Sequence, residues 1–335
     1  MSLRSIFMAL LLWSGSAYSA PVAIIIHGGA GTITRENLTP ELEQAYKDAL
    51  GSAIEFGYEQ LHHGRPSEEV VVAVIKRLED SPLFNAGHGA VLTHEEKVEL
   101  DASIMRGSDL NAGAIAAVTN IKNPIELALS VMNHSKHVML AGAGAEQFAR
   151  EQGFSEVPNT YFVTPRRLEQ VQRAKAREAS ATIPKPEKYG TVGAVALDQA
   201  GTISAGTSTG GMTNKRFGRV GDAPVIGAGT YADNTVCGIS ATGHGEYFIR
   251  AAVAHDICAR ALYQGISLQA AANHVVMNKL VDMGGDGGIV ALNPAGELVY
   301  AFNTEGMYRA GIDASGNRML GIYKDDGNNE SAEQR

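Results

Sequence analysis

The first regular feature of the chain is an apolar run over residues 22–26, in which four of the five side chains are β-branched. A short uninterrupted run of this kind predicts a buried strand. Residues 27–31 follow as His-Gly-Gly-Ala-Gly, and their three glycines predict a tight loop directly after that strand.

The next segment has the period of a helix. Thr39, Pro40 and Glu41 supply an N-cap, a first-turn proline and an acid near the positive end of the helix dipole. The helix is predicted to continue to about residue 61, with an inward-facing stripe formed by Leu42, Tyr46, Ala49, Leu50 and Ala53.

Local patterns predict further elements in both halves of the chain. Predicted helices cover residues 67–78, begin at the Asn-Pro pair 123–124, and cover 245–263 and 267–283. Predicted strands cover 98–105, 112–119, 191–197, 202–207, 288–292 and 297–303, with two more near Val225 and Val236. Strands grouped by hairpins and helices grouped in pairs indicate an α+β fold, in which helical layers cover antiparallel sheets.

Two segments stand apart from this pattern. Residues 160–190 hold three prolines and several basic residues, which predicts an exposed, partly helical linker. Residues 1–19 have the charged, apolar and small-residue order of a signal peptide, with Ala17 and Ser19 as the small pair before the cut. The apolar run is too short to span a bilayer. We therefore expect an exported, periplasmic protein that has no membrane segment after signal removal.

Composition narrows the possible functions. The 335-residue chain carries 28 Lys and Arg against 36 Asp and Glu, a net charge of −8, and neither sign is gathered into a long block. A nucleic-acid partner is therefore not expected. Cys237 and Cys258 are too few for a disulfide framework or a Cys-rich zinc site, and sequence alone leaves open whether they form one bridge.

The sequence does not support three familiar kinds of active or cofactor site. Ser208 lies in Gly-Thr-Ser-Thr-Gly, the pattern of a serine nucleophile elbow, but the glycine-broken sequence after it does not predict the helix that the elbow needs. Gly142 and Gly144 begin a dinucleotide fingerprint whose third glycine position is Gln147. The ten histidines include no His-Glu-x-x-His pair, so a zinc enzyme is not expected.

The junction between Gly190 and Thr191 offers another nucleophile. If this bond were cut, Thr191 would carry both a hydroxyl nucleophile and a free α-amine to act as its base. The amine would have a pKa of about 7.7 to 8.0, so part of it is neutral near neutral pH. The alternative is an ordinary β-branched residue at the start of a strand.

Longer motifs decide between these alternatives. The chain resembles the plant-type asparaginase and isoaspartyl peptidase family of N-terminal-nucleophile hydrolases, which is related to glycosylasparaginase. The resemblance extends from about residue 22 to 323, and the motifs that carry it lie at 26–31, 78–87, 99–103, 190–198, 207–215, 218–224 and 242–246. It implies one structural domain, a four-layer αββα sandwich of two mainly antiparallel sheets flanked by helices. It also implies self-cleavage into an α subunit (20–190) and a β subunit (191–335).

The resemblance assigns roles to individual residues. Thr191 is the nucleophile, cleavage falls between Gly190 and Thr191, and Thr209 hydrogen-bonds the nucleophile. Thr242 and the Gly243 amide form the oxyanion hole. The substrate lies against Arg219, Asp222, Gly243 and Gly245, where the guanidinium holds an α-carboxylate and the carboxylate an α-ammonium. His244 either tunes the pocket beyond the β-carbonyl or is a bystander.

The remaining expectations concern ions, partners and competing functions. The resemblance implies no cofactor for catalysis and a structural sodium ion on mainly backbone carbonyls of Leu78, Glu79, Ser81, Phe84, Ala86 and His88. It implies dipeptide and other small substrates, and a dimer of αβ heterodimers. The expected reaction is hydrolysis of isoaspartyl dipeptides and L-asparagine through a β-aspartyl-threonine intermediate. Glycosylasparaginase activity and an exported solute-binding protein are the alternatives.

Overall fold

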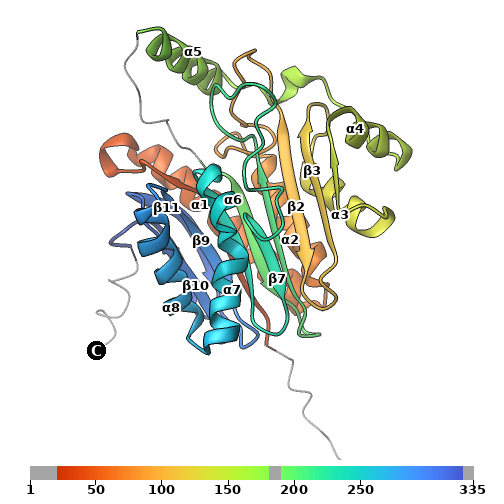
Figure 1. The fold of residues 1–335 in the computed structure, drawn as a ribbon, viewed down its shortest axis with the longest axis vertical. Coiled ribbons are helices and arrows are strands. Elements are labelled where there is room, and N and C mark those ends of the chain that lie inside the picture. The colour runs from red at the N-terminus through yellow and green to blue at the C-terminus, as the bar shows by residue number, and fades with distance from the viewer. Residues whose placement is uncertain (1–20, 181–189, 327–335) are drawn as a thin grey trace, which may run out of the picture.

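The computed structural model describes residues 21–180 and 190–326. Figure 1 shows the described residues as a layered sandwich of helices and strands. The predicted signal peptide and residues 181–189 of the predicted linker lie outside the described residues.

The larger sheet has eight strands and collects segments from both ends of the chain. Its order is β12-β11-β1-β5-β6-β2-β3-β4, and every neighbouring pair is antiparallel apart from β3 and β4. Its strands are β1 (Ala23–Gly31), β2 (Leu100–Arg106), β3 (Ala112–Val118), β4 (Met139–Ala141), β5 (Val192–Leu197), β6 (Ile203–Thr209), β11 (Gly306–Ile312) and β12 (Arg318–Tyr323).

The second sheet has four antiparallel strands in the order β10-β9-β8-β7. They are β7 (Thr230–Asp233), β8 (Cys237–Gly243), β9 (Gly287–Leu292) and β10 (Leu298–Phe302). Apolar side chains from both sheets, including Ile25, Val195 and Val290, form a buried cluster between them. The two sheets therefore pack face to face, as expected for a sandwich.

Helices cover both outer faces. The helices α1 (Pro40–His62), α2 (Ser67–Glu79) and α3 (Pro124–His134) pack on the eight-stranded sheet, while α7 (Val253–Gln264) and α8 (Leu268–Asn273) pack on the four-stranded sheet. The other helical segments are α4 (Gly142–Glu151), α5 (Pro165–Ala179), α6 (Gly245–Ala251), α9 (Leu280–Asp282), a π-helix (His274–Lys279) and two 3₁₀ turns (Arg35–Asn37 and Asn159–Phe162). The predicted α+β, αββα architecture is confirmed.

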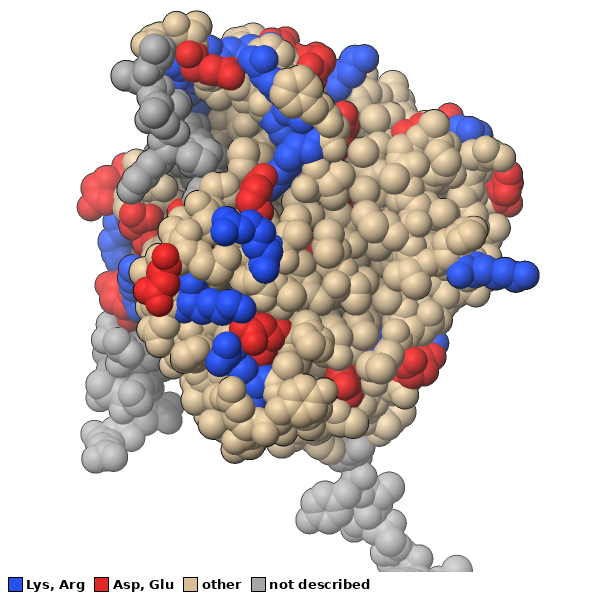
Figure 2. All heavy atoms as spheres, in the orientation of Figure 1, with Lys and Arg blue, Asp and Glu red and all other residues tan. Residues whose placement is uncertain are grey.

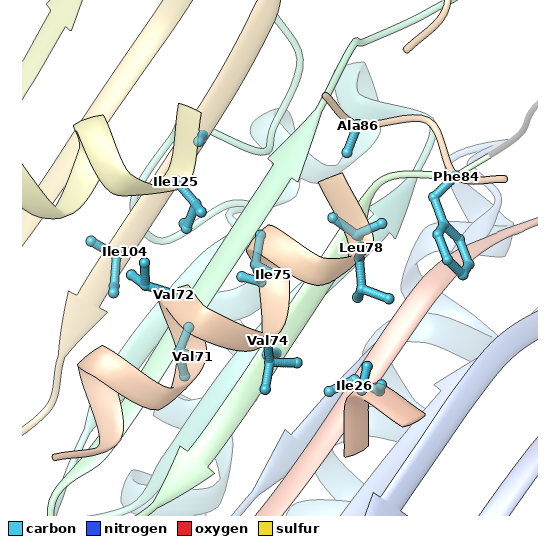
Figure 3. Packing of buried hydrophobic residues seen from close by; sticks show 14 of the residues in the cluster. Ile26, Val71, Val72, Val74, Ile75, Leu78, Phe84, Ala86, Ile104 and Ile125 are labelled. Atoms are coloured by element: carbon cyan, nitrogen blue, oxygen red, sulfur yellow. The ribbon is translucent and has the colours of Figure 1, made fainter. Parts of the chain in front are cut away.

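Local sequence explains the best-defined helices. The Thr39 hydroxyl accepts a hydrogen bond from the Leu42 amide at 3.3 Å, as predicted for an N-cap. Figure 3 shows Val71, Ile75 and Leu78 of α2 packed over the strands of the larger sheet. Each such side chain contributes about 1.5–3 kcal/mol when it is fully buried.

Some predicted boundaries are wrong. Residues 27–31 are not a loop: they continue β1 and pair with β11 across a β-bulge between His27 and Gly29. The predicted strand near Val225 is a turn, in which the Val225 amide donates to the Asp222 carbonyl at 2.9 Å. The predicted helix over 245–263 is interrupted at Ala252, whose φ of 47° is left-handed.

The linker prediction is correct in part. Helix α5 occupies most of the described linker, and the Thr164 hydroxyl caps it by accepting from the Arg167 amide. The linker is not simply exposed, because Arg167 is 1% exposed and its Nε donates to the Gly89 carbonyl at 2.6 Å. Arg167 therefore anchors helix α5 to the loop that follows α2.

The surface bears on the partner predictions. On the face in Figure 2, Lys and Arg alternate with Asp and Glu along one side, while the middle is largely uncharged. This face carries no continuous basic stripe of the kind that nucleic acid requires. Within residues 21–180 and 190–326, no helix is both long and apolar enough to cross a bilayer.

Candidate active site

One pocket gathers residues from both sheets at the point where β5 begins. Thr191 lies directly before β5, Thr209 ends β6, and Thr242 and Gly243 end β8. The pocket is lined by Gly190, Thr191, Thr209, Arg219, Asp222, Thr242, Gly243 and His244, together with Ala30, Asn85 and neighbouring loop residues. Predicted site residues that are far apart in the sequence therefore meet in one place, together with Ala30 and Asn85, for which the sequence predicts no role.

Thr191 is held at two positions, and the residue before it at a third. Its hydroxyl donates to the Thr209 hydroxyl at 3.1 Å, and its carbonyl accepts a hydrogen bond from Nδ1 of His27 at 3.1 Å. The preceding carbonyl, that of Gly190, accepts from the Asn85 amide at 3.3 Å. The Asn85 side chain is fixed in turn, because its amide group donates to the Gly211 carbonyl and its oxygen accepts from the Val91 amide.

Two glycines make the approach to Thr191 possible. The backbones of Gly29 and Gly190 cross so closely that a β-carbon on either residue would overlap the Cα of the other. Gly29 also has a φ of 112°, which L side chains rarely adopt. The close passage of residue 190 thus explains Gly29, while Gly28 is explained by Phe84, whose ring a β-carbon at Gly28 would overlap.

The end of β8 offers a donor that has no partner among the described residues. The Thr242 hydroxyl is buried and has no hydrogen-bond partner among the described residues. Gly243 follows with a φ of 152°, and a β-carbon there would lie 2.5 Å from the Asp286 carbonyl. A buried hydroxyl that lacks a partner costs free energy. The Thr242 hydroxyl is therefore suited to donate a hydrogen bond to a bound ligand.

Arg219 is already paired with a carboxylate of the protein. Its Nε and Nη2 each donate to one oxygen of Glu246 at 2.9 Å, and the Arg219 side chain is 19% exposed. Glu246 lies in the motif at residues 242–246, but the sequence predicts no role for it. The bidentate geometry shows that the guanidinium is oriented to hold a carboxylate.

Asp222 lies beside this pair in a different state. It is buried, and its Oδ2 has no hydrogen-bond partner among the described residues. Desolvation raises the pKa of Asp222 to about 7, although Arg219 and a backbone hydrogen bond favour its charged form. Gly245 borders the carboxylate, since a β-carbon there would lie 2.8 Å from Asp222 Oδ1. Such a carboxylate is suited to a cationic ligand group.

His244 lies at the edge of the pocket. Its ring packs edge-on against Tyr247 with 4.8 Å between centroids, and its Nε2 lies 3.3 Å from Glu246 Oε2. The imidazole is therefore within reach of the same carboxylate that holds Arg219, and it borders whatever occupies the outer part of the pocket.

The serine-elbow interpretation is wrong. Ser208 is fully buried, and its hydroxyl donates to Glu79 Oε1 at 2.6 Å at the end of α2, on the helix-covered side of the sheet. No helix follows it: β6 ends at Thr209, and the next regular element is β7. Ser208 therefore neither lines the pocket nor has the strand–turn–helix geometry of an elbow.

The loop predicted to hold sodium follows α2. The Glu79 carbonyl accepts from the His88 amide at 2.7 Å, and the carbonyl oxygens of Pro82 and Phe84 both face Gly89. The Glu79 carboxylate points elsewhere, toward Ser208, Asn123 and the Ile125 amide. The donors that remain for an ion are neutral backbone oxygens, which fit a hard monovalent cation. The described part of the chain contains no group of three or more His, Cys, Asp or Glu side chains able to hold a metal.

Comparisons with known proteins agree with this geometry. A sequence profile of the asparaginase family matches residues 20–322. The chain is 47% identical to an isoaspartyl peptidase of Escherichia coli over 91% of this chain and 97% of that protein. It is 44% identical to a plant-type L-asparaginase of Pyrococcus horikoshii (85% and 94%), and 39% identical to an isoaspartyl peptidase/L-asparaginase of Xenopus laevis (91% and 96%).

Proposed function

The chain belongs to the asparaginase family, and from this premise we propose that it is a β-aspartyl hydrolase that works through Thr191. It cleaves isoaspartyl dipeptides and L-asparagine and releases L-aspartate. The observation that carries the proposal is the pocket itself, where the Thr191 hydroxyl meets Thr209, a carboxylate-binding arginine and an unpartnered carboxylate.

Self-cleavage prepares the nucleophile. The Thr191 hydroxyl oxygen adds to the carbonyl carbon of Gly190, whose oxygen already accepts from the Asn85 amide. The bond between Gly190 and Thr191 breaks, the nitrogen takes up a proton as a free α-amine, and an ester remains. Water hydrolyses this ester, which leaves a carboxylate on Gly190 and restores the Thr191 hydroxyl.

Turnover then repeats the chemistry on the substrate. The α-amine of Thr191 takes the hydroxyl proton and delivers it to the leaving amine, while the hydroxyl oxygen forms an ester with the β-carbonyl. Arg219 holds the substrate α-carboxylate and Asp222 its α-ammonium. Thr242 and the Gly243 amide stabilise the oxyanion, and one such donor is commonly worth about 3 to 4 kcal/mol. Water finally releases L-aspartate.

The alternative functions differ in their support. The relatives reported above are named as isoaspartyl peptidases or asparaginases, so the interpretation as an enzyme is confirmed and a solute-binding protein is not retained. Glycosylasparaginase activity has no observation in its favour. We retain as proposals the export of the protein after loss of residues 1–19, a periplasmic location, assembly as a dimer of αβ heterodimers, and a sodium ion on the loop after α2.

The first test is whether the chain cuts itself. The purified protein is expected to resolve on a denaturing gel into chains ending at residue 190 and beginning Thr-Val-Gly-Ala at residue 191, as read by N-terminal sequencing. Thr191→Ala is expected to leave one uncut chain without hydrolysis of L-asparagine or β-aspartyl dipeptides, because both steps need the hydroxyl. Ser208→Ala is the matched control and should cut and hydrolyse. An active preparation of uncut chains would contradict the proposal.

A further inference from the structure

A continuous row of buried polar side chains runs between the two sheets. It consists of His27 on β1, Ser240 on β8, Thr207 on β6, Thr230 on β7 and Ser103 on β2, and each is fully buried. In this order, successive polar atoms lie 2.9, 2.7, 2.6 and 2.8 Å apart. Buried groups at these distances are hydrogen-bonded throughout, so the row is one connected network.

One end of the row meets the pocket, and the other lies beside the loop that carries Asp222. At one end, His27 Nδ1 bonds the carbonyl of Thr191 at 3.1 Å. At the other end, the Ser103 hydroxyl lies 2.6 Å from the carbonyl of Ala223, the residue after Asp222. Because Ser103 has one hydrogen, which it donates to Thr230 when Thr230 donates to Thr207, the row of hydrogen bonds runs from the Thr191 carbonyl to Ser103 and ends beside the loop that carries Asp222.

The direction of the hydrogen bonds follows from the groups at the nucleophile end. Burial lowers the pKa of His27 to about 3, so the ring is neutral and carries one N–H. The Thr191 carbonyl can only accept, so this N–H lies on Nδ1, and Nε2 accepts from Ser240. Ser240 has then used its hydrogen and accepts from Thr207, which accepts from Thr230.

We infer that His27 is a positioning residue for Thr191: the Thr191 carbonyl fixes the hydrogen on Nδ1, and Ser240 and Thr207 hold the ring in place through Nε2. This inference rests on the proposed function. The hydroxyl of Thr191 is fixed by Thr209 and its carbonyl by His27, so rotation about the Thr191 backbone is restrained from both sides. Gly193 permits the arrangement, because a β-carbon there would overlap the Ser240 hydroxyl.

The chain provides a matched control for a buried hydroxyl pair. The hydroxyls of Ser67 and Ser204 lie 2.9 Å apart and are fully buried, and Ser204 belongs to β6, as Thr207 does. Thr207 is three positions after Ser204, an odd number, so the two side chains point to opposite faces of the strand. Ser204→Ala thus removes a comparable hydrogen bond on the face that does not meet the pocket.

Kinetics give the first test, with L-asparagine and a β-aspartyl dipeptide as substrates. Ser240→Ala and Thr207→Val are expected to lower kcat about ten- to hundredfold with KM within about twofold, because misplacement of a reacting group by about 1 Å costs a rate factor of this size. Self-cleavage should slow in the same variants. Ser204→Ala should keep kcat within about twofold. An unchanged kcat in Ser240→Ala, or an equal loss in Ser204→Ala, would overturn the inference.

Nitrogen NMR gives a test that does not depend on activity. In ¹⁵N-histidine-labelled protein, the His27 signals, assigned by their loss in His27→Gln, should show a neutral ring with hydrogen on Nδ1 at pH 7. In Ser240→Ala the hydrogen should stay on Nδ1, and the Nε2 signal should shift because that nitrogen loses its hydrogen bond from Ser240. Hydrogen on Nε2 in the unaltered protein would refute the inference, whatever its enzymatic activity. Hydrolysis by Thr191→Ala would instead refute the proposed function and leave the His27 tautomer as a separate finding.

Discussion

Arg219 and Glu246 form a carboxylate–guanidinium pair at the place where a substrate carboxylate is proposed to bind. The pair uses the Nε hydrogen and one Nη2 hydrogen of Arg219, so a second carboxylate binds through Nη1 and the other Nη2 hydrogen or displaces Glu246. Because the Glu246 side chain is 45% exposed, water screens the pair, and its net contribution to stability is small. The role of Arg219 in substrate binding can therefore be measured without loss of the fold.

Arg219→Ala is expected to allow self-cleavage while it lowers kcat/KM for β-aspartyl dipeptides by a factor of tens to thousands. Loss of one partner of a charged, hydrogen-bonded pair commonly costs about 2 to 5 kcal/mol. The loss should be much smaller for dipeptides whose aspartyl α-carboxylate is amidated. Arg216→Ala is the control, since Arg216 lies in the same loop, pairs with Glu178 and does not line the pocket. Equal losses on both substrates would mean that Arg219 does not contact the carboxylate.

At the residue scale, sequence could identify groups that belong to long motifs but not their partners. Thr191, Thr209, Arg219 and Thr242 lie in motifs of recognisable length, and the structure brings them together. The sequence predicts a loop at His27, because a histidine followed by glycines does not have the pattern of a strand. Its partner Ser240 is 213 residues away, and no local pattern links the two positions.

At the scale of elements, capping and periodicity were the reliable signals. Helix α1 begins at Pro40 and ends at His62, within one residue of expectation, because Thr39 caps it and its apolar stripe is regular. The sequence predicts too short a strand β1, because Gly29 and Gly28 are required by contacts with Gly190 and Phe84 that only the folded chain creates. The sequence does not predict β11 and β12: Arg309 interrupts the apolar run of the buried β11, and β12 begins with exposed and partly exposed residues, so neither shows the alternation expected of a strand.

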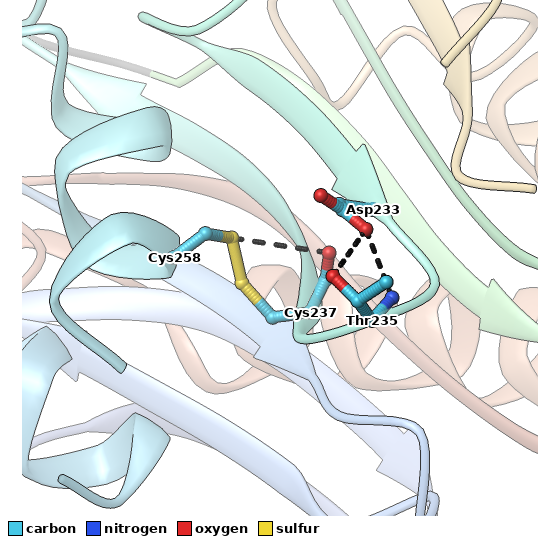
Figure 4. The surroundings of a disulfide bond; sticks show 4 residues. All are labelled: Asp233, Thr235, Cys237 and Cys258. Carbon is cyan, nitrogen blue, oxygen red and sulfur yellow. Dashed lines mark hydrogen bonds between the residues drawn. A yellow bond between two sulfur atoms is a disulfide. The ribbon is translucent and has the colours of Figure 1, made fainter. Parts of the chain in front are cut away.

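The pairing of the two cysteines was also beyond local patterns. Figure 4 shows the bond between Cys237 at the start of β8 and Cys258 on α7, near the β7–β8 turn, where Asp233 accepts from the amide and hydroxyl of Thr235. Both cysteines are buried, and the bond closes a segment of 21 residues. It ties helix α7 to the strand whose other end carries Thr242.

Replacement of both cysteines by alanine is expected to lower the free energy of unfolding by about 3 kcal/mol, because a loop of this length loses the corresponding restriction of the unfolded chain. Urea unfolding followed by circular dichroism measures the change. The kcat of the folded variant at 25 °C should stay within about twofold, since neither sulfur lines the pocket. Two free thiols titrated in the unreduced, unfolded protein would show that the bond does not form.

At the scale of the whole molecule, the sandwich could be predicted only through the family resemblance. Local patterns indicated antiparallel sheets and helical layers, but β1 lies between β11 and β5, strands that are far from it in sequence. The sandwich also buries ionisable groups whose energetic effect no sequence pattern reveals. Burial raises the pKa of Glu79 to about 8 and that of Asp222 to about 7, and it lowers the pKa of His27 to about 3.

These shifts predict that the protein loses stability as the pH rises from 6.5 to 8. The unfolded chain has ordinary values of 4.5 for Glu79 and 3.8 for Asp222, so in this range it has lost protons that the folded protein still binds, and stability falls with pH. His27 acts in the opposite direction but only below its ordinary value of 6.5. The slope is at most about 1.4 kcal/mol per pH unit for each group, with Asp222 contributing up to about pH 7 and Glu79 up to about pH 8.

Urea unfolding of Thr191→Ala, which stays a single chain under the proposed mechanism, measures the slope without interference from the cut. Adding Glu79→Gln should abolish the decrease between pH 7 and 8, whereas adding Glu55→Gln, which alters an exposed acid of lowered pKa, should leave it in place. A decrease of the same size in the Glu79→Gln background would show that Glu79 is not the group that holds the proton.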